Sequence, residues 1–336
     1  MTLFTLLIST ALIIKTNQAS QQKFILYDTN PGEGFNLRRD VYIRIANLVK
    51  GLNEVEERES TDVEYTLVLP PWGRIGYHWG HEENQIPWAD FFNVEALNKH
   101  IPVIEFEEFN SNHDFIDNIW YLQHYVEGWG EKFEEKVDDR ECISNDHHYQ
   151  SEKDGNGLFS GWFYGYREVR GKQFKCVSAQ GMARVLIPKI RSAEGDSVFI
   201  DRAETVLHDK FGQLDYWSAR RSMQFSEKLF GVAVNFEKMS GLISENNEKI
   251  EYLGENWGNY NSKKLAEKEG GKYIACHLRR RDFLRMQKHR NIPTMKGAAK
   301  FLLKKAEEYG VDKIYSAFKT TFRPTTSIWS FLVFFG

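Results

Sequence analysis

A short glycine-flanked turn near the amino end holds the first residues that could do chemistry. It runs from Asn30 to Asn36 and reads NPGEGFN. Its glycines let the backbone approach a ligand closely, and a carboxylate held in such a turn at a cleft is well placed to accept a proton. Asn36 is a good N-cap for a helix whose free N–H groups would face that ligand. The turn therefore predicts Glu33 as a general base. The alternative is a tight strand-to-helix turn with a solvated carboxylate.

Two arginines, Arg38 and Arg39, follow in the expected first turn of that helix. Cations there oppose the helix dipole, at a cost of about 0.3 to 1 kcal/mol each. An anion should compensate them. Asp40 and Glu33 can supply it within the protein, and a ligand phosphate or an acidic substrate surface can supply it from outside.

A second group of candidate residues is the basic segment from His277 to Phe283, HLRRRDF, which follows an apolar run. Strand alternation places His277 and Arg279 on one face, while Leu278 packs inward. An arginine at a strand end offers a planar fork for a diphosphate and stabilises the charge that grows on a leaving group. The alternative is a solvated basic turn in which Asp282 is the partner.

Both groups are expected at strand ends of βαβ units. The first unit is predicted as strand Lys23–Tyr27, helix Asn36 to about Leu52, and strand Tyr65–Leu69; the second as strand Lys272–Leu278, helix Lys296–Tyr309, and strand Asp312–Phe318. Right-handed crossovers make the paired strands parallel, with ligands at their carboxyl edge. The fold class predicted is α/β, with two Rossmann-like domains that face a cleft.

Between these two βαβ units the spacing of apolar residues indicates strands and helices less clearly. Strands are predicted at Ile101–Phe106, Gln173–Val177 and Ser197–Ile200, helical spacing runs through Trp217–Val234, and the polar Ser240–Lys268 is interpreted as a linker or an exposed helix pair.

The G-x-G of the first turn lacks the third glycine and the later acidic residue of a dinucleotide fingerprint, which disfavours an oxidoreductase.

Length, composition and charge limit the classes of protein to which this chain can belong. The chain has 336 residues, 41% of them hydrophobic, and a formal net charge of -3. This length predicts two globular domains. The near balance of charge leaves no basic footprint of the kind that nucleic-acid binding needs, so no nucleic-acid partner is expected.

The amino end suggests entry into the secretory pathway. Residues Met1 to Ser20 are predicted as a signal peptide, because the apolar run from Leu3 to Ile14 is too short to span a bilayer. The apolar end, Ser327 to Gly336, is also too short, so no stable membrane span is expected.

The secretory route affects how the three cysteines are interpreted. A disulfide between Cys142 and Cys176 would add about 3 to 4 kcal/mol of stability. Cys276 is predicted as a free thiol in a buried strand. No metal-ligand spacing is present, so no metal is expected.

Several long motifs resemble the protein O-fucosyltransferase family, and within it the enzymes that fucosylate thrombospondin type 1 repeats. The resemblance covers roughly Phe24 to Tyr315. Its motifs are YDTNPGEGFNLRRDVYIRIA, LVLPPWGR, IPWADFF, IPVIEFEEF, FIDRAE and HLRRRDF.

The resemblance implies a GT-B fold in the lumen of the endoplasmic reticulum. It also implies inverting transfer of fucose from GDP-fucose, as co-substrate, to a Ser or Thr hydroxyl without a metal. Glu33 matches the catalytic base, and the matching donor-binding residues are Gly32, Gly34, Phe35, Asn36, His277, Leu278 and Arg279, supported by Asp282. The family also has a disulfide that matches Cys142 with Cys176.

The chain departs from the family after Tyr315, where further αβ units are expected. We therefore expect an incomplete second domain, a truncated product such as an alternatively spliced form, weak donor binding and poor folding. The predicted division is a signal peptide at 1–20, an N-terminal domain at 21–245, a partial C-terminal domain at 246–315 and a divergent tail at 316–336. The alternatives are a truncated, catalytically impaired form that binds acceptors, and the related enzyme for EGF repeats.

Overall fold

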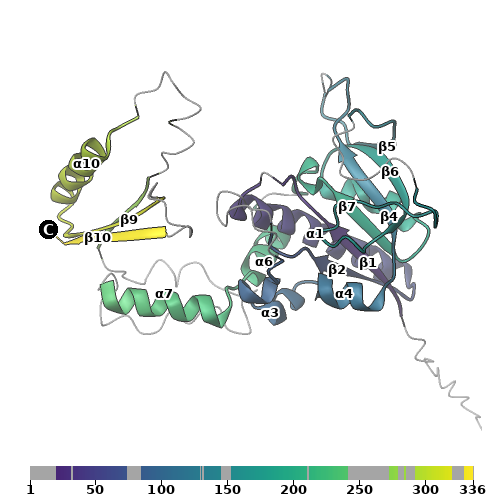
Figure 1. Ribbon diagram of the computed structural model, residues 1–336, viewed down its shortest axis with the longest axis horizontal. Helices are drawn as coiled ribbons and strands as arrows, with labels where there is room; N and C mark the ends of the chain where they lie inside the picture. The colour runs from purple at the N-terminus through teal and green to yellow at the C-terminus, as the bar shows by residue number, and fades with distance from the viewer. Residues whose placement is uncertain are drawn as a thin grey trace, which may run out of the picture.

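The computed structural model describes residues 20–31, 33–73, 85–128, 130, 132–144, 153–209, 212–240, 272–278, 284, 292–319 and 329–335. Its larger part is a seven-stranded sheet with helices on both faces (Figure 1). The strands, in sheet order, are β3 (Val103–Glu105), β2 (Val63–Leu69), β1 (Gln21–Tyr27), β7 (Ser197–Asp201), β4 (Ile116–Gln123), β6 (Gly171–Gln180) and β5 (Lys136–Asp139). All neighbouring pairs are parallel except β5 with β6.

The first predicted βαβ unit is confirmed. Strands β1 and β2 pair in parallel, and the helix between them, α1 (Phe35–Glu59), continues beyond Leu52. Its buried stripe includes Val41, Ile45 and Leu48, as the spacing predicts, but Leu37 is 36% exposed. The stripe begins only at Val41 because the first turn of α1 lies at the edge of the sheet rather than over it.

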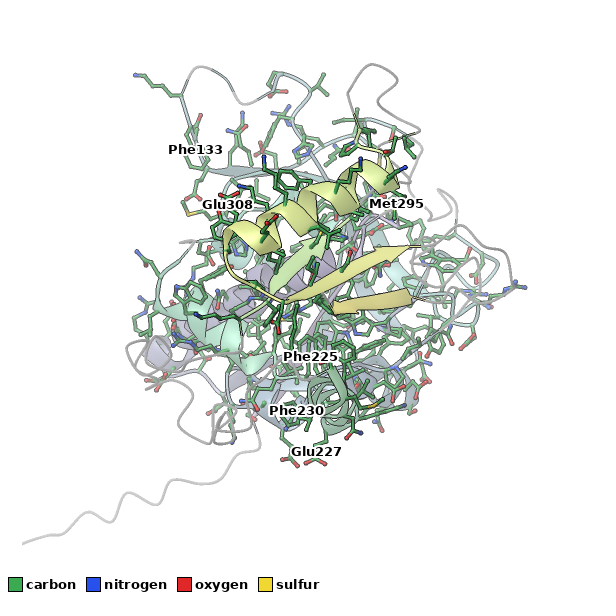
Figure 2. The ribbon with its side chains drawn as sticks, turned by 90° about the vertical axis from the view of Figure 1, so that its left-hand side faces the viewer. Phe133, Phe225, Glu227, Phe230, Met295 and Glu308 are labelled. Atoms are coloured by element: carbon green, nitrogen blue, oxygen red, sulfur yellow. A yellow bond between two sulfur atoms is a disulfide. The ribbon has the colours of Figure 1, made fainter. Side chains whose placement is uncertain are left out.

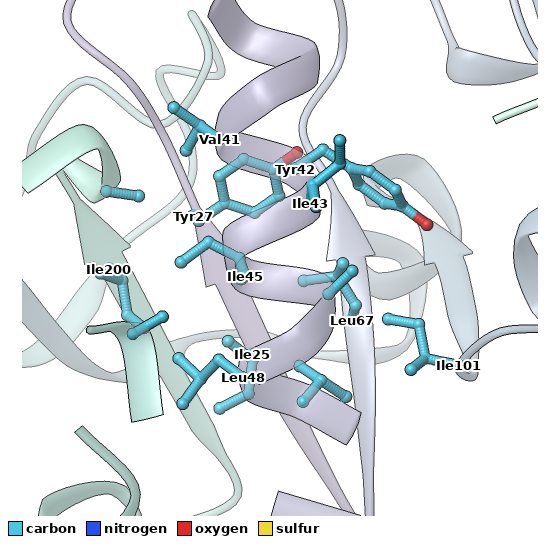
Figure 3. Packing of buried hydrophobic residues seen from close by; sticks show 14 of the residues in the cluster. Ile25, Tyr27, Val41, Tyr42, Ile43, Ile45, Leu48, Leu67, Ile101 and Ile200 are labelled. Atoms are coloured by element: carbon cyan, nitrogen blue, oxygen red, sulfur yellow. The ribbon is translucent and has the colours of Figure 1, made fainter. Parts of the chain in front are cut away.

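Both faces of the sheet are buried, which explains why its strands are apolar runs. On β1, Ile25 and Tyr27 pack toward α1 (Figure 3). Phe24 and Leu26 belong to a second cluster, on the opposite face. That second face is covered partly by α4 (Phe106–Asn112). The sheet is therefore a rigid platform whose carboxyl edge carries the turns.

The middle of the chain differs in places from its prediction. The strand expected at Ile101–Phe106 is β3, three residues long, because Phe106 already begins α4. The expected helical stretch is two helices, α6 (Leu214–Ser222) and α7 (Glu227–Ser240). They separate where Phe225 pairs with Phe92 in an isolated bridge and stacks on its ring. The shorter helices are α3 (Val94–Asn98) and α5 (Ile187–Arg191).

The second unit forms a small sheet of order β10-β9-β8, above α7 in Figure 1. Strands β8 (Ile274–His277) and β9 (Lys313–Lys319) are parallel and joined through α10 (Met295–Glu308), as predicted. Figure 2 shows α10 from Met295 to Glu308 beside this sheet. The buried residues of α10 are Ala298 and Ala306, whereas Leu303 is 55% exposed.

The tail contributes a strand to this sheet. Strand β9 crosses residue 316, and β10 (Trp329–Phe335) pairs with it in antiparallel register from Trp329 against Lys319 to Phe335 against Lys313. Strand β9 is therefore paired on both sides, with β8 and with β10. The division into domains stays a prediction. In the described part of the chain, no helix has the length and apolar character that a membrane crossing requires.

Two predictions about cysteines are tested. Cys142 and Cys176 form a disulfide, with Cα atoms 5.2 Å apart. Cys276 is free, as predicted, but it is half-buried rather than buried. Strand β8 alternates half-buried and exposed positions.

Candidate functional site

The helix after the glycine-flanked turn begins one residue earlier than predicted. Gly34 is the N-cap, in an extended conformation and without a side-chain cap, and Asn36 is an exposed residue of the first turn. Phe35 sets this start because its ring packs against Trp72, with centroids 4.7 Å apart, and against Phe91 and Phe92. The prediction of Asn36 as N-cap was therefore wrong.

Glu33 lies half-buried at this turn. Its N–H donates to the carbonyl of Asn30 at 2.9 Å, and its carbonyl accepts from Arg38 Nε at 3.1 Å. Its carboxylate forms no hydrogen bond or ion pair with the described residues. The turn thus fixes the backbone of Glu33 and leaves its carboxylate available to accept a proton.

A second loop holds the turn in place. The N–H of Asn30 donates to Glu204 Oε2 at 3.2 Å, and the N–H of Ala203 donates to the carbonyl of Asp28 at 2.9 Å. Arg44 of α1 donates to the carbonyl of Glu204 at 3.1 Å. Burial raises the pKa of Glu204. Sequence reasoning missed this loop, although the FIDRAE motif contains it.

The two arginines of the first turn have different partners. Arg38 binds the carbonyl of Glu33, while the Arg39 guanidinium lies over the rings of Phe35, Phe92 and Phe225, 5.3 to 5.7 Å from their centroids. Burial, then the charge of Arg220, lowers the pKa of Arg39 to about 10.

Asp40 does not compensate either of these charges. Its carboxylate accepts from Arg44 Nη2 at 2.6 Å and from His208 Nε2 at 2.9 Å. Burial opposes ionisation of Asp40, but the hydrogen bonds from His208 and Arg44 outweigh it and lower the pKa to about 2. The sequence suggested Asp40 as a compensating anion, but Asp40 binds Arg44 and His208 instead.

A buried carboxyl group lies at the end of β7, beside the turn. Asp201 is 6% exposed, and burial, then the charge of Asp28, raises its pKa to about 8. Its Oδ1 accepts the N–H of Arg202 at 2.8 Å. At neutral pH this group is mostly protonated, so it adds no second negative charge next to Asp28.

A small open pocket adjoins the turn at the carboxyl ends of β1 and β2. It is lined by Asp28, Thr29, Pro31, Arg38, Pro71, Gly73, Trp162 and Tyr164. The Tyr164 hydroxyl donates to the carbonyl of Tyr27 at 2.8 Å and ties the 162–164 loop to β1. A ligand in this pocket would lie beside Arg38, which binds the carbonyl of Glu33.

The second predicted group is described only in part. His277 is exposed at the end of β8, and Leu278 is half-buried. Gly32, Arg279 and Asp282 lie outside the described residues. Among the residues that are described, none of the first turn contacts His277, and the site formed by the two groups stays a prediction. In the described ranges, no three His, Cys, Asp or Glu residues form a metal-binding group.

Comparison with known proteins identifies the family. A family model described as GDP-fucose protein O-fucosyltransferase matches residues 24–327. The chain belongs to this family. Relatives named GDP-fucose protein O-fucosyltransferase 2 support the assignment. The Caenorhabditis elegans protein is 42% identical over 304 residues, which are 89% of this chain and 68% of the relative. The Homo sapiens protein is 42% identical over 311 residues, 90% of this chain and 69% of the relative.

A solved structure agrees on the fold. The crystal structure of POFUT1 in complex with GDP-fucose has a TM-score of 0.50 and 13% sequence identity, and the likeness covers 90% of this chain and 79% of that one. The fold class is thus α/β of GT-B type, as predicted. Members of the GDP-fucose protein O-fucosyltransferase family are glycosyltransferases, so the chain is assigned to an enzyme family.

Proposed function

We propose that this protein transfers fucose from GDP-fucose to Ser or Thr hydroxyls of folded thrombospondin type 1 repeats in the lumen of the endoplasmic reticulum, after removal of a signal peptide. The single observation that carries the proposal is the free carboxylate of Glu33. Its backbone is held from both sides, yet its side chain has no partner among the described residues.

This arrangement suits an inverting displacement. The acceptor hydroxyl attacks the anomeric carbon of fucose and forms the new C–O bond, while the bond to the GDP oxygen breaks on the opposite face of the sugar. Glu33 takes the hydroxyl proton, and GDP leaves with the bonding electrons. The negative charge that grows on the diphosphate needs a positive partner, a role for which we propose Arg279 with His277, Leu278 and Asp282 around it.

We propose that the turn that holds Glu33 also binds the donor, GDP-fucose. Gly32, Gly34, Phe35 and Asn36 are proposed to contact GDP-fucose, because a turn without bulky side chains admits close approach of the sugar to the base. Phe35 is held by Trp72 and Phe92, so its backbone is well placed for this. Arg38 and Arg39 support the turn. No metal is required in this scheme, since the arginine supplies the charge.

The test is transfer of labelled fucose from GDP-fucose to a purified repeat. We expect transfer to a folded thrombospondin type 1 repeat, little to the same repeat after reduction, and little to an EGF repeat. The product should have the opposite anomeric configuration from the donor. Equal transfer to the EGF repeat would favour the related enzyme, and binding of the repeat without any transfer would favour the catalytically impaired acceptor-binding form.

A further inference from the structure

The pocket lined by Arg38 contains a hydroxyl that has no partner among the described residues. Thr29 is 3% exposed, and its Oγ1 is buried without a hydrogen bond. Its N–H donates to Asp28 Oδ1 at 2.7 Å, which fixes the residue at the end of β1. Burial of a hydroxyl without a partner is unfavourable, so a group that completes this hydrogen bond is expected in the pocket that Thr29 lines.

Arg38 brings further donors to the same pocket. Its Nε is used on the carbonyl of Glu33 at 3.1 Å. Among the described residues, its terminal nitrogens form no hydrogen bond. A guanidinium carries five N–H donors, so most of them remain for a ligand. A ligand bound to Arg38 would therefore be linked directly to the backbone of the proposed base.

The chemistry of the lining selects a neutral polar group. Asp28 offers carboxylate oxygens as acceptors, and Arg38 and Thr29 offer donors. Pro71 and Trp162 form apolar walls. A peptide group matches this lining, because it carries one N–H donor and one C=O acceptor on a flat frame. A free anion would gain from Arg38 but would be repelled by Asp28.

We propose that this pocket binds a peptide group of the acceptor chain next to the modified Ser or Thr. The inference rests on the proposed function. In that reaction the base removes a proton from the acceptor hydroxyl, so residues on its own side of the cleft face the acceptor. All lining residues come from the part of the chain that forms the seven-stranded sheet, whereas the proposed diphosphate contacts follow β8. The acceptor carbonyl accepts from Arg38 and Thr29, and its N–H donates to Asp28.

Calorimetric binding of a folded thrombospondin type 1 repeat, and separately of GDP, tests this proposal on the full chain. Thr29→Val removes the hydroxyl at nearly constant shape, and Thr29→Ser keeps it. Loss of one neutral hydrogen bond should weaken binding of the repeat about three- to tenfold in Thr29→Val. Thr29→Ser should bind like the wild type. GDP affinity should be unchanged in both variants.

Two further variants sharpen the result. Thr66→Val makes the same exchange at a buried strand position, where Oγ1 accepts from Gln22 Nε2, and should leave repeat binding unchanged. Arg38→Gln removes a charged donor and should weaken repeat binding about ten- to a hundredfold. Thr66→Val shows whether such an exchange at a buried position disturbs folding in general. Arg38→Gln shows whether loss of a second contact in the pocket weakens binding of the repeat.

The proposal is overturned if Thr29→Val binds the repeat as tightly as the wild type, if GDP affinity falls instead, or if the wild-type chain does not bind the repeat. Fucose transfer measured beside binding separates this failure from failure of the proposed function. Transfer by the wild type with an unchanged Thr29→Val variant refutes the pocket alone. Binding that depends on Thr29 without any transfer supports the pocket and contradicts the proposed reaction.

Discussion

Asp201 should make the stability of this protein depend on pH in a defined direction. Its pKa is raised by burial and then by Asp28, from 3.8 to about 8. Between those two pH values the unfolded chain releases the proton of this carboxyl group, whereas the folded chain retains it. The free energy of unfolding therefore falls as pH rises, by up to about 1.4 kcal/mol for each pH unit. From pH 5 to pH 7 this one group accounts for up to about 2.7 kcal/mol.

Asp201→Asn isolates this contribution. The amide keeps the oxygen that accepts the N–H of Arg202, but it cannot ionise. We expect the variant to lose part of the decline in stability between pH 5 and pH 7, measured by urea unfolding at each pH. Asp62→Asn is the matched control, because Asp62 is exposed. If the stability curves of Asp201→Asn and the wild type run parallel over this range, the carboxyl group is ionised in the folded protein and the reasoning is wrong.

Two further predictions concern stability. Replacing Cys142 and Cys176 by serine opens a loop of 34 residues and should lower the free energy of unfolding by about 3 to 4 kcal/mol, measured by urea unfolding; a change near zero would contradict it. Gly195 has a φ of +84°, and an added Cβ would lie 2.5 Å from Asp117 Cγ. Gly195→Ala should therefore cost about 1 to 3 kcal/mol in thermal unfolding, whereas Gly212→Ala, at a similar φ but in open space, should cost less.

The strands and helices with strong apolar patterns could be predicted from the sequence. β1, α1 and β2 were placed because their buried residues recur at strand and helix spacing, and β8, α10 and β9 followed the same pattern. The central strand β4 was missed. Its Asp117 and Asn118 interrupt the apolar run, yet Asn118 is buried and donates to the carbonyl of Glu194 at 2.6 Å. Only the folded chain supplies that partner.

The site, too, could be predicted where it depends on neighbouring residues in the sequence, and not where it depends on partners that only the folded chain supplies. The glycines around Glu33 indicated a turn that could hold a base, and that turn is where the sequence placed it. The clamp by Glu204 was not predictable, because it joins residues 174 positions apart along the chain. The start of α1 was misplaced because the packing of Phe35 on Trp72 outweighed the capping preference of Asn36.

The most direct test of the central claim compares Glu33→Gln with the wild type in fucose transfer to a folded repeat. If Glu33 is the general base, Glu33→Gln should lower kcat about 10²- to 10⁴-fold while GDP affinity and folding stay unchanged. The exposed Glu108→Gln is the control and should transfer like the wild type. Near-normal kcat in Glu33→Gln would contradict the account.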